Sequence, residues 1–139
     1  MDLDVSFSTA RYVDVPEEEQ YIPGSLNRVV AAGISVNPPQ DVRAGAFGSL
    51  RLRHFGPRPL IEDNSVQSRP TTIVNGEVGY KFSERLRLVL QGFNLFDAEV
   101  SDIDYYFASR LHDEPEPVED IHFHAAIPRS ARLALNVSF

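Results

Sequence analysis

The sequence predicts an all-β fold, an antiparallel up-and-down meander of about six long strands. Three observations support this fold class. Apolar and polar side chains alternate with period two in six segments, and side chains change face with that period along a β-strand. Each segment has about ten residues, the length of a tilted membrane-spanning strand, whereas other strands typically have about five or six. The connections between the segments are in turn long, short, long, short and long.

The first two predicted strands flank a long loop. Residues 2–11 alternate, with aspartate and serine on one face and leucine, valine and phenylalanine on the other. Residues 14–27 are rich in proline, glycine and acidic side chains, which predicts a loop. Residues 28–37 alternate again, and a short turn at 38–41 follows, because its two prolines cannot donate hydrogen bonds to a strand ladder.

The next three predicted strands are separated by one long loop and one tight turn. Residues 42–55 alternate and end where two prolines begin the long loop 56–70. Residues 71–82 alternate up to the tight turn 83–85, and residues 86–96 form the fifth predicted strand.

The last connection, 97–129, is the longest and is predicted to be an acidic loop. Its carboxylates are Asp97, Glu99, Asp102, Asp104, Asp113, Glu114, Glu116, Glu119 and Asp120. Such a run is usually a solvated surface, although it could also form a funnel for cations. The sixth predicted strand, 130–139, alternates up to the aromatic Phe139.

The alternation predicts two chemically opposite faces of one sheet. One face should carry Leu50, Leu52, Val78, Tyr80, Leu88, Leu90, Leu133, Leu135 and Val137. The other should carry Arg51, Arg53, Glu77, Lys81, Arg87 and Asn136. Arginines alternating with leucines suit a barrel with a wet interior, so the apolar face is predicted to face lipid and the polar face a lumen. Arg51 and Arg53 could line a path for anionic substrates, although ordinary lumen polarity is the simpler interpretation.

Composition excludes several classes of function. The chain has no cysteine, and therefore no disulfide framework, thiolate metal site or cysteine nucleophile. The formal charge of −7 argues against a nucleic-acid partner. No apolar run approaches the ~18–20 residues of a membrane helix. No secretory signal begins the sequence, so we expect either a cytoplasmic protein or the tail of a longer precursor.

Several of these segments together resemble a known family. They are Asn75-Gly-Glu-Val-Gly-Tyr-Lys-Phe82, then Leu86 to Gly92 followed by Phe-Asn-Leu-Phe-Asp, Pro128-Arg129, and the last strand ending on Phe139. This arrangement resembles the C-terminal part of TonB-dependent outer-membrane receptors. The resemblance implies that residues 1–139 are the last six strands of a 22-stranded transmembrane β-barrel, without its plug domain and earlier strands.

The resemblance also implies a function, a location and partners. The parent receptor would use TonB to energise uptake of a scarce solute, such as a ferric siderophore, across the outer membrane. The chain would not be an enzyme and would need no cofactor. Its partners would be outer-membrane lipid, the rest of the barrel and plug, TonB through the absent N-terminal region, and the barrel-assembly machinery. The machinery would read a C-terminal signal formed by Leu133, Leu135, Val137 and Phe139.

Two groups of residues are candidate sites. The motif Asn94, Leu95, Phe96 and Asp97 is predicted to be structural, because asparagine and aspartate close local turns. His122 and His124, with Asp120, share a face if extended and are weak candidates for a transition-metal site; surface histidines are the simpler interpretation.

Two alternatives remain open at this point. One is a small water-soluble β-barrel that binds a ligand inside its apolar face. The other is a secreted glycan-active enzyme that uses a pair of loop carboxylates. Neither a nucleophile elbow, a phosphate-binding loop nor a zinc-protease motif occurs in the sequence.

Overall fold

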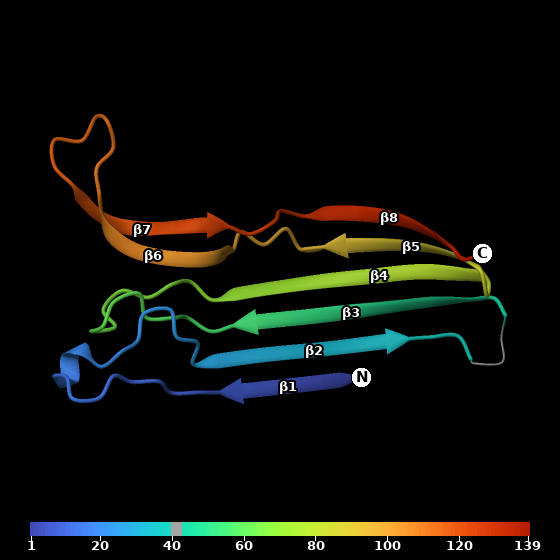
Figure 1. Cartoon of the computed structure of the whole chain (residues 1–139), viewed down its shortest axis with the longest axis horizontal. Coiled ribbons are helices and arrows are strands. Elements are labelled where there is room, and N and C mark those ends of the chain that lie inside the picture. The colour runs from blue at the N-terminus through green and yellow to red at the C-terminus, as the bar shows by residue number, and fades with distance from the viewer. Residues whose placement is uncertain (40–42) are drawn as a thin grey trace.

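The computed structural model describes residues 1–39 and 43–139 and contains two antiparallel sheets (Figure 1). The larger sheet has six strands in the order β1-β2-β3-β4-β5-β8, and β6 and β7 form a separate two-stranded hairpin. The strands are β1 (Asp2–Phe7), β2 (Arg28–Val36), β3 (Gly45–Phe55), β4 (Thr71–Ser83), β5 (Leu86–Phe93), β6 (Ser101–Ser109), β7 (Val118–Ala125) and β8 (Ser130–Val137). The described residues add one short 3-10 helix, Glu17–Glu19.

The structure confirms an all-β fold with an antiparallel meander sheet. The long connections between β1 and β2, β3 and β4, and β5 and β8 lie at one end of the sheet (Figure 1). The tight turn between β4 and β5 lies at the opposite end, where β2 also ends and β3 begins. At this turn Lys81 donates a hydrogen bond of 2.5 Å to the Glu84 carboxylate and thereby lowers the pKa of Glu84.

The connection 97–129 differs from the prediction, because it contains the β6–β7 hairpin and is not wholly a loop. Its carboxylates alternate with aromatic and β-branched side chains, such as those of Ile103, Tyr105 and Phe107. These residues favour strands, and in the hairpin they pair with His124, His122 and Asp120 of β7. The high acid content therefore concealed a strand pattern. The predicted turn at 38–41 and the predicted strand start at Val42 lie partly outside the described residues.

The register separates the two predicted sets of side chains onto opposite faces. Directly paired residues share a face, and the pairs include Ile34 with Leu50, Val78 with Leu90, and Leu90 with Leu133. On the opposite face Glu77 pairs with Gln91, and Gln91 with Arg132. We call these the apolar face and the polar face.

The six-stranded sheet has very little core. In the described part of the chain, Leu60 and Val89 are the only buried large hydrophobic side chains, with 6% and 8% exposure. On the apolar face Leu133 is 67% exposed and Val78 59%. No helix in the described ranges is long and apolar enough to cross a membrane. The sheet is a single layer, and no element among residues 1–39 and 43–139 covers its apolar face (Figure 1).

The sheet is also open at both edges. Among the described residues β1 pairs only with β2, and β8 pairs only with β5. Each outer edge therefore presents a row of unpaired backbone N–H and C=O groups, which can template pairing with a further strand.

On the polar face the ring of Phe47 in β3 packs against Gly79 in the neighbouring strand β4. Phe47 pairs with Gly79, which in turn pairs with the buried Val89. A Cβ atom at Gly79 would overlap the Phe47 ring and lie 2.7 Å from the backbone oxygen of Leu88. The glycine thus lets an aromatic side chain pack flat onto the sheet.

Gly79→Ala should lower the free energy of unfolding by about 1–3 kcal/mol, because a backbone oxygen cannot move aside as a side chain can. Guanidinium unfolding in detergent, followed by far-ultraviolet circular dichroism, measures this change. Gly76→Ala is the matched control, since its Cβ would meet only leucine methyl groups at 3.1 and 3.3 Å and backbone oxygen at 3.6 Å. Equal losses in the two variants would contradict the role of Phe47 and the Leu88 oxygen.

Candidate functional site

The Asn94–Asp97 motif forms the junction between the six-stranded sheet and the β6–β7 hairpin. Asn94 is only 3% exposed. Asn94 and Asp97 both have left-handed backbone conformations, with φ of 48° and 53°. Asparagine and aspartate tolerate this conformation better than other residues with side chains, which explains their positions in the motif.

The Asn94 side chain ties together both ends of the inserted hairpin. Its Nδ2 donates to the backbone oxygens of Ala98 at 3.0 Å and Ile127 at 3.4 Å, and its Oδ1 accepts from the Ala98 N–H at 3.0 Å. The Asn94 N–H donates to Oδ1 of Asn75 in β4 at 2.9 Å. These contacts give Asn94 a structural role, since it links the chain entering the hairpin to the chain leaving it.

Asp97 completes the junction. Its Oδ1 accepts a hydrogen bond of 3.0 Å from the Arg129 N–H, and its other carboxylate oxygen lies 3.7 Å from the Arg129 guanidinium. The carboxylate therefore fixes the backbone immediately before β8. Phe96 is largely exposed and makes no comparable contact in the hydrogen-bond network.

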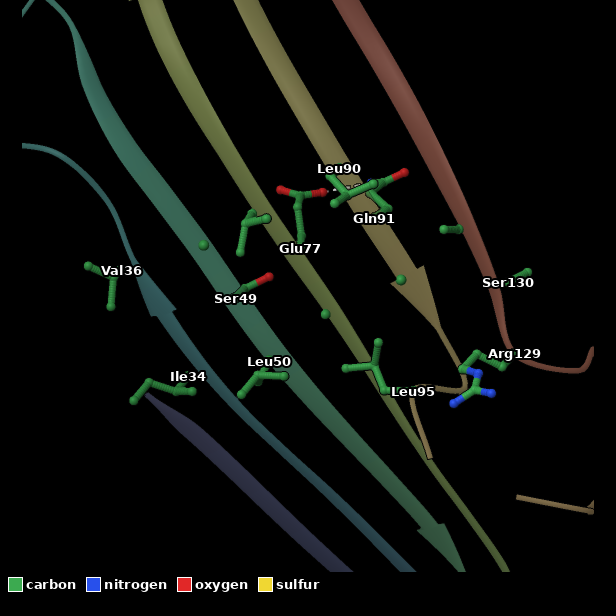
Figure 2. Close-up of a pocket in the computed structure, with 15 residues that line it drawn as sticks. Ile34, Val36, Ser49, Leu50, Glu77, Leu90, Gln91, Leu95, Arg129 and Ser130 are labelled. Carbon is green, nitrogen blue, oxygen red and sulfur yellow. Dashed lines mark hydrogen bonds between the residues drawn. The ribbon is translucent and has the colours of Figure 1, made fainter. Parts of the chain in front are cut away.

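Leu95 turns onto the apolar face and covers two glycines. Gly76, Gly92 and Ala131 form one row across three neighbouring strands, where no side chain extends beyond Cβ. The Leu95 methyl groups would lie 3.1 Å from a Cβ at Gly76 and 2.5 Å from one at Gly92. Beside Leu95 the row leaves an apolar groove of about 790 Å³ (Figure 2).

The polar face carries hydrogen-bonded charged groups. Arg51 of β3 forms an exposed ion pair with Asp2 of β1 at 2.5 Å. Gln91 donates to Glu77 at 2.6 Å and accepts from Arg132 Nε at 2.8 Å, so a polar chain crosses β4, β5 and β8. This part of the face suits contact with water.

Arg53 also lies on the polar face, with its guanidinium carbon 5.1 Å from the centre of the Phe55 ring. The two arginines singled out in the sequence are therefore on one face but have different partners. Arg51 contacts an acid, and Arg53 contacts an aromatic ring.

A buried ion pair joins the loop 56–70 to the β6–β7 hairpin. Arg58 Nη2 lies 2.7 Å from Asp104 Oδ2, and the two side chains are 13% and 6% exposed. Ser101 donates to the second Asp104 oxygen at 2.5 Å, and Ser68 accepts from the Arg58 N–H at 3.0 Å. This cluster was not predicted, because its partners are 46 residues apart and no local pattern links them.

A second hollow of about 720 Å³ lies between this loop and the hairpin. Its lining combines acids, including Asp97, Asp104 and Asp120, with Phe123 and the cation Arg69. The segments that line the hollow, residues 68–71, 97–104 and 120–128, lie at the end of the sheet where the long connections are (Figure 1).

The structure places the candidate metal ligands in β7, on one face of the hairpin. His122 stacks on Phe107 with ring centres 3.9 Å apart, and His124 meets the edge of Tyr105 at 6.2 Å. Asp120 accepts a hydrogen bond from the Ile121 N–H. Within residues 1–39 and 43–139 no three histidine or carboxylate side chains form a group able to hold a metal ion. On the opposite hairpin face, desolvation and then the Glu119 carboxylate raise the pKa of Tyr106.

Three of the four residues of the expected C-terminal signal occupy one face. Leu133, Leu135 and Val137 of β8 lie exposed on the apolar face, and Phe139 follows the strand as a fully exposed side chain. Comparison of the chain with protein-family models, curated proteins and solved structures finds no match.

Asn94→Ala should release the hairpin, because the part-buried Ala98 N–H loses its acceptor, which costs about 1–2 kcal/mol. Hydrogen–deuterium exchange of residues 98–127 should become faster by about tenfold or more. The control is Asn64→Ala, since Asn64 has a similar φ of 62° but makes only an exposed side-chain bond to Gln67. Equal exchange in both variants would exclude the proposed tie.

Asp104→Asn should separate the loop 56–70 from the hairpin, because removal of one charge from a buried pair costs about 3–5 kcal/mol. Limited proteolysis within 56–70 should become faster. Asp102→Asn makes the same charge change, but Asp102 contacts Arg58 only through its backbone oxygen, at 3.5 Å. That control should keep the normal cleavage rate. Equal cleavage rates in the two variants would contradict a role of the Arg58–Asp104 pair in holding the loop to the hairpin.

Proposed function

We propose that the six-stranded sheet is a section of the wall of an outer-membrane transport barrel of the TonB-dependent receptor type. One observation carries this proposal. A single-layer sheet exposes a continuous apolar face on one side and a hydrogen-bonded, charged face on the other. Outer-membrane barrels have this arrangement, with lipid outside and water inside.

The energetics favour lipid as the environment of the apolar face. In water this face would exceed the few hundred Å² of contiguous apolar surface that monomeric proteins usually expose. In lipid the same side chains need no cover. The reverse orientation is unfavourable, because an arginine at the lipid midplane costs about 2–4 kcal/mol. Arg51, Arg53 and Arg132 therefore belong to the water side.

Aromatic side chains support a membrane boundary at both ends of the apolar face. Tyr80 and Phe82 lie near the tight-turn end, with ring centres 4.9 Å apart, and both are substantially exposed. Phe7 lies near the long-loop end, opposite Arg28. Barrels carry such aromatic girdles at the two lipid–water boundaries.

The open edges imply further strands in the complete barrel. An unsatisfied backbone group costs several kcal/mol in lipid, so an open sheet cannot remain there alone. The proposed partners are the remaining barrel strands and plug, the assembly machinery at the C-terminal strand, TonB through an N-terminal region, and outer-membrane lipid. The transported solute would be a scarce one, such as a ferric siderophore. The long-loop end, with its hollow of about 720 Å³, would face outwards.

Site-directed fluorescence quenching tests the orientation of the two faces. The natural chain has no cysteine, so single cysteines can carry a dye at chosen positions. Dyes at Leu135→Cys and Leu52→Cys should be strongly quenched in mixed micelles by phospholipids with nitroxide-labelled acyl chains. Dyes at the neighbouring positions Asn136→Cys and Arg53→Cys should be quenched several-fold less.

Two results would contradict the proposal. The first is equal quenching of neighbouring positions in both pairs. The second is a stable, monodisperse monomer in water without detergent, measured by light scattering, because it would favour a water-soluble ligand-binding barrel.

A further inference from the structure

Over β4, β5 and β8 the groove on the apolar face has a floor of small residues. Its floor is the row formed by Gly76, Gly92 and Ala131, and Leu95 closes part of it from the long-loop end (Figure 2). Leu50 and Val78 form its other sides. The volume of about 790 Å³ lies in the range of about 300–1,000 Å³ typical of ligand sites.

One cation, Arg129, lies at the end of this apolar groove. The lining also includes Glu77, but its carboxylate accepts a hydrogen bond from Gln91 on the polar face. Arg129 contributes to the lining at the long-loop end, and its side chain is 62% exposed (Figure 2). Among the described residues its one ion-pair partner is Asp97. The Arg129 N–H donates to one oxygen of that carboxylate at 3.0 Å, and the guanidinium lies 3.7 Å from the other oxygen, beyond hydrogen-bond distance. The guanidinium is thus loosely paired and accessible to another anion.

From these features we infer that the groove binds one acyl chain of a phosphate-bearing anionic lipid, with the Arg129 guanidinium on the phosphate. The inference rests on the proposed lipid-facing orientation of this face. Within a membrane an acyl chain gains no hydrophobic free energy by moving from lipid into an apolar groove, because the two surroundings are equally apolar. Selectivity must therefore come from the shape of the groove beside Leu95 and from the charge of Arg129. A guanidinium forms two parallel hydrogen bonds with phosphate oxygens, which favours an anionic headgroup over a zwitterionic one.

Photo-cross-linking in mixed micelles tests the site. The probes are phosphatidylglycerol and phosphatidylcholine, each with a diazirine in the middle of one acyl chain, and adducts are mapped by mass spectrometry. Phosphatidylglycerol adducts should concentrate on the groove residues of β4, β5 and β8. They should be several-fold fewer on apolar residues of the same face that lie outside the groove lining, such as Leu3, Val5 and Val30.

Two pairs of variants test the groove and its cation separately. Ala131→Phe fills the groove and should reduce these adducts about tenfold. Ala46→Phe places the same ring on the same face outside the groove and should not reduce them. Arg129→Gln should remove a preference of about fivefold for phosphatidylglycerol. Arg132→Gln, on the polar face, should leave that preference unchanged.

The outcomes distinguish failure of the site from failure of the proposed function. Adducts spread evenly over the apolar face, or unaffected by Ala131→Phe, would refute the groove while leaving the face in lipid. A phosphatidylglycerol preference that survives Arg129→Gln would refute the assigned headgroup contact. Adducts equally abundant on both faces would overturn the lipid-facing orientation itself.

Discussion

The structure depends on one continuous hydrogen-bonded ladder between strands. Almost no side chain is buried, so packing contributes little to the six-stranded sheet, and the register must be held by backbone pairing and cross-strand side-chain pairs. A shift of one residue would move every apolar side chain to the polar face. The two rows described above, Gly76–Gly92–Ala131 and Glu77–Gln91–Arg132, both exist only in this register. The strand register therefore determines which side chains each face of the sheet exposes.

Alternation in the sequence predicted most of the sheet, because period two is a property of each strand alone. It predicted the strand segments, the antiparallel order and the membership of the two faces, with ends that differ by a few residues. It did not predict β6 and β7, whose aromatic residues are interspersed with acids. The Arg58–Asp104 pair and the glycine row could not be found in this way, because both need contacts between segments distant in sequence. The contacts of Asn94 with Ala98 and Ile127 could not be predicted either, because the backbone atoms it binds become visible only in three dimensions.

Long connections at one end of a sheet need restraints of their own, because loops rarely have a core. Here three separate contacts supply them. Asn94 links the two ends of the hairpin, Asp97 holds the backbone before β8, and Arg58 joins the loop 56–70 to Asp104. At the opposite end a tight turn joins β4 and β5. The asymmetry between the two ends thus extends from connection length to side-chain chemistry, and it places the polar hollow where the connections are longest.

The insertion of β6 and β7 between β5 and β8 has a consequence for the order of folding. A closed loop of 94–129 must form before β8 can pair with β5, and loop closure loses chain entropy. The β6–β7 hairpin involves only local contacts and can form within microseconds. Once it has formed, Ala98 and Ile127 are near each other, and the effective loop shrinks to roughly a quarter of its length. Each halving of a loop saves about 0.6 kcal/mol, so the hairpin lowers the barrier to β8 pairing by about 1 kcal/mol. A segment that looks like a surface appendage thereby acts as a folding aid for the last strand of the sheet.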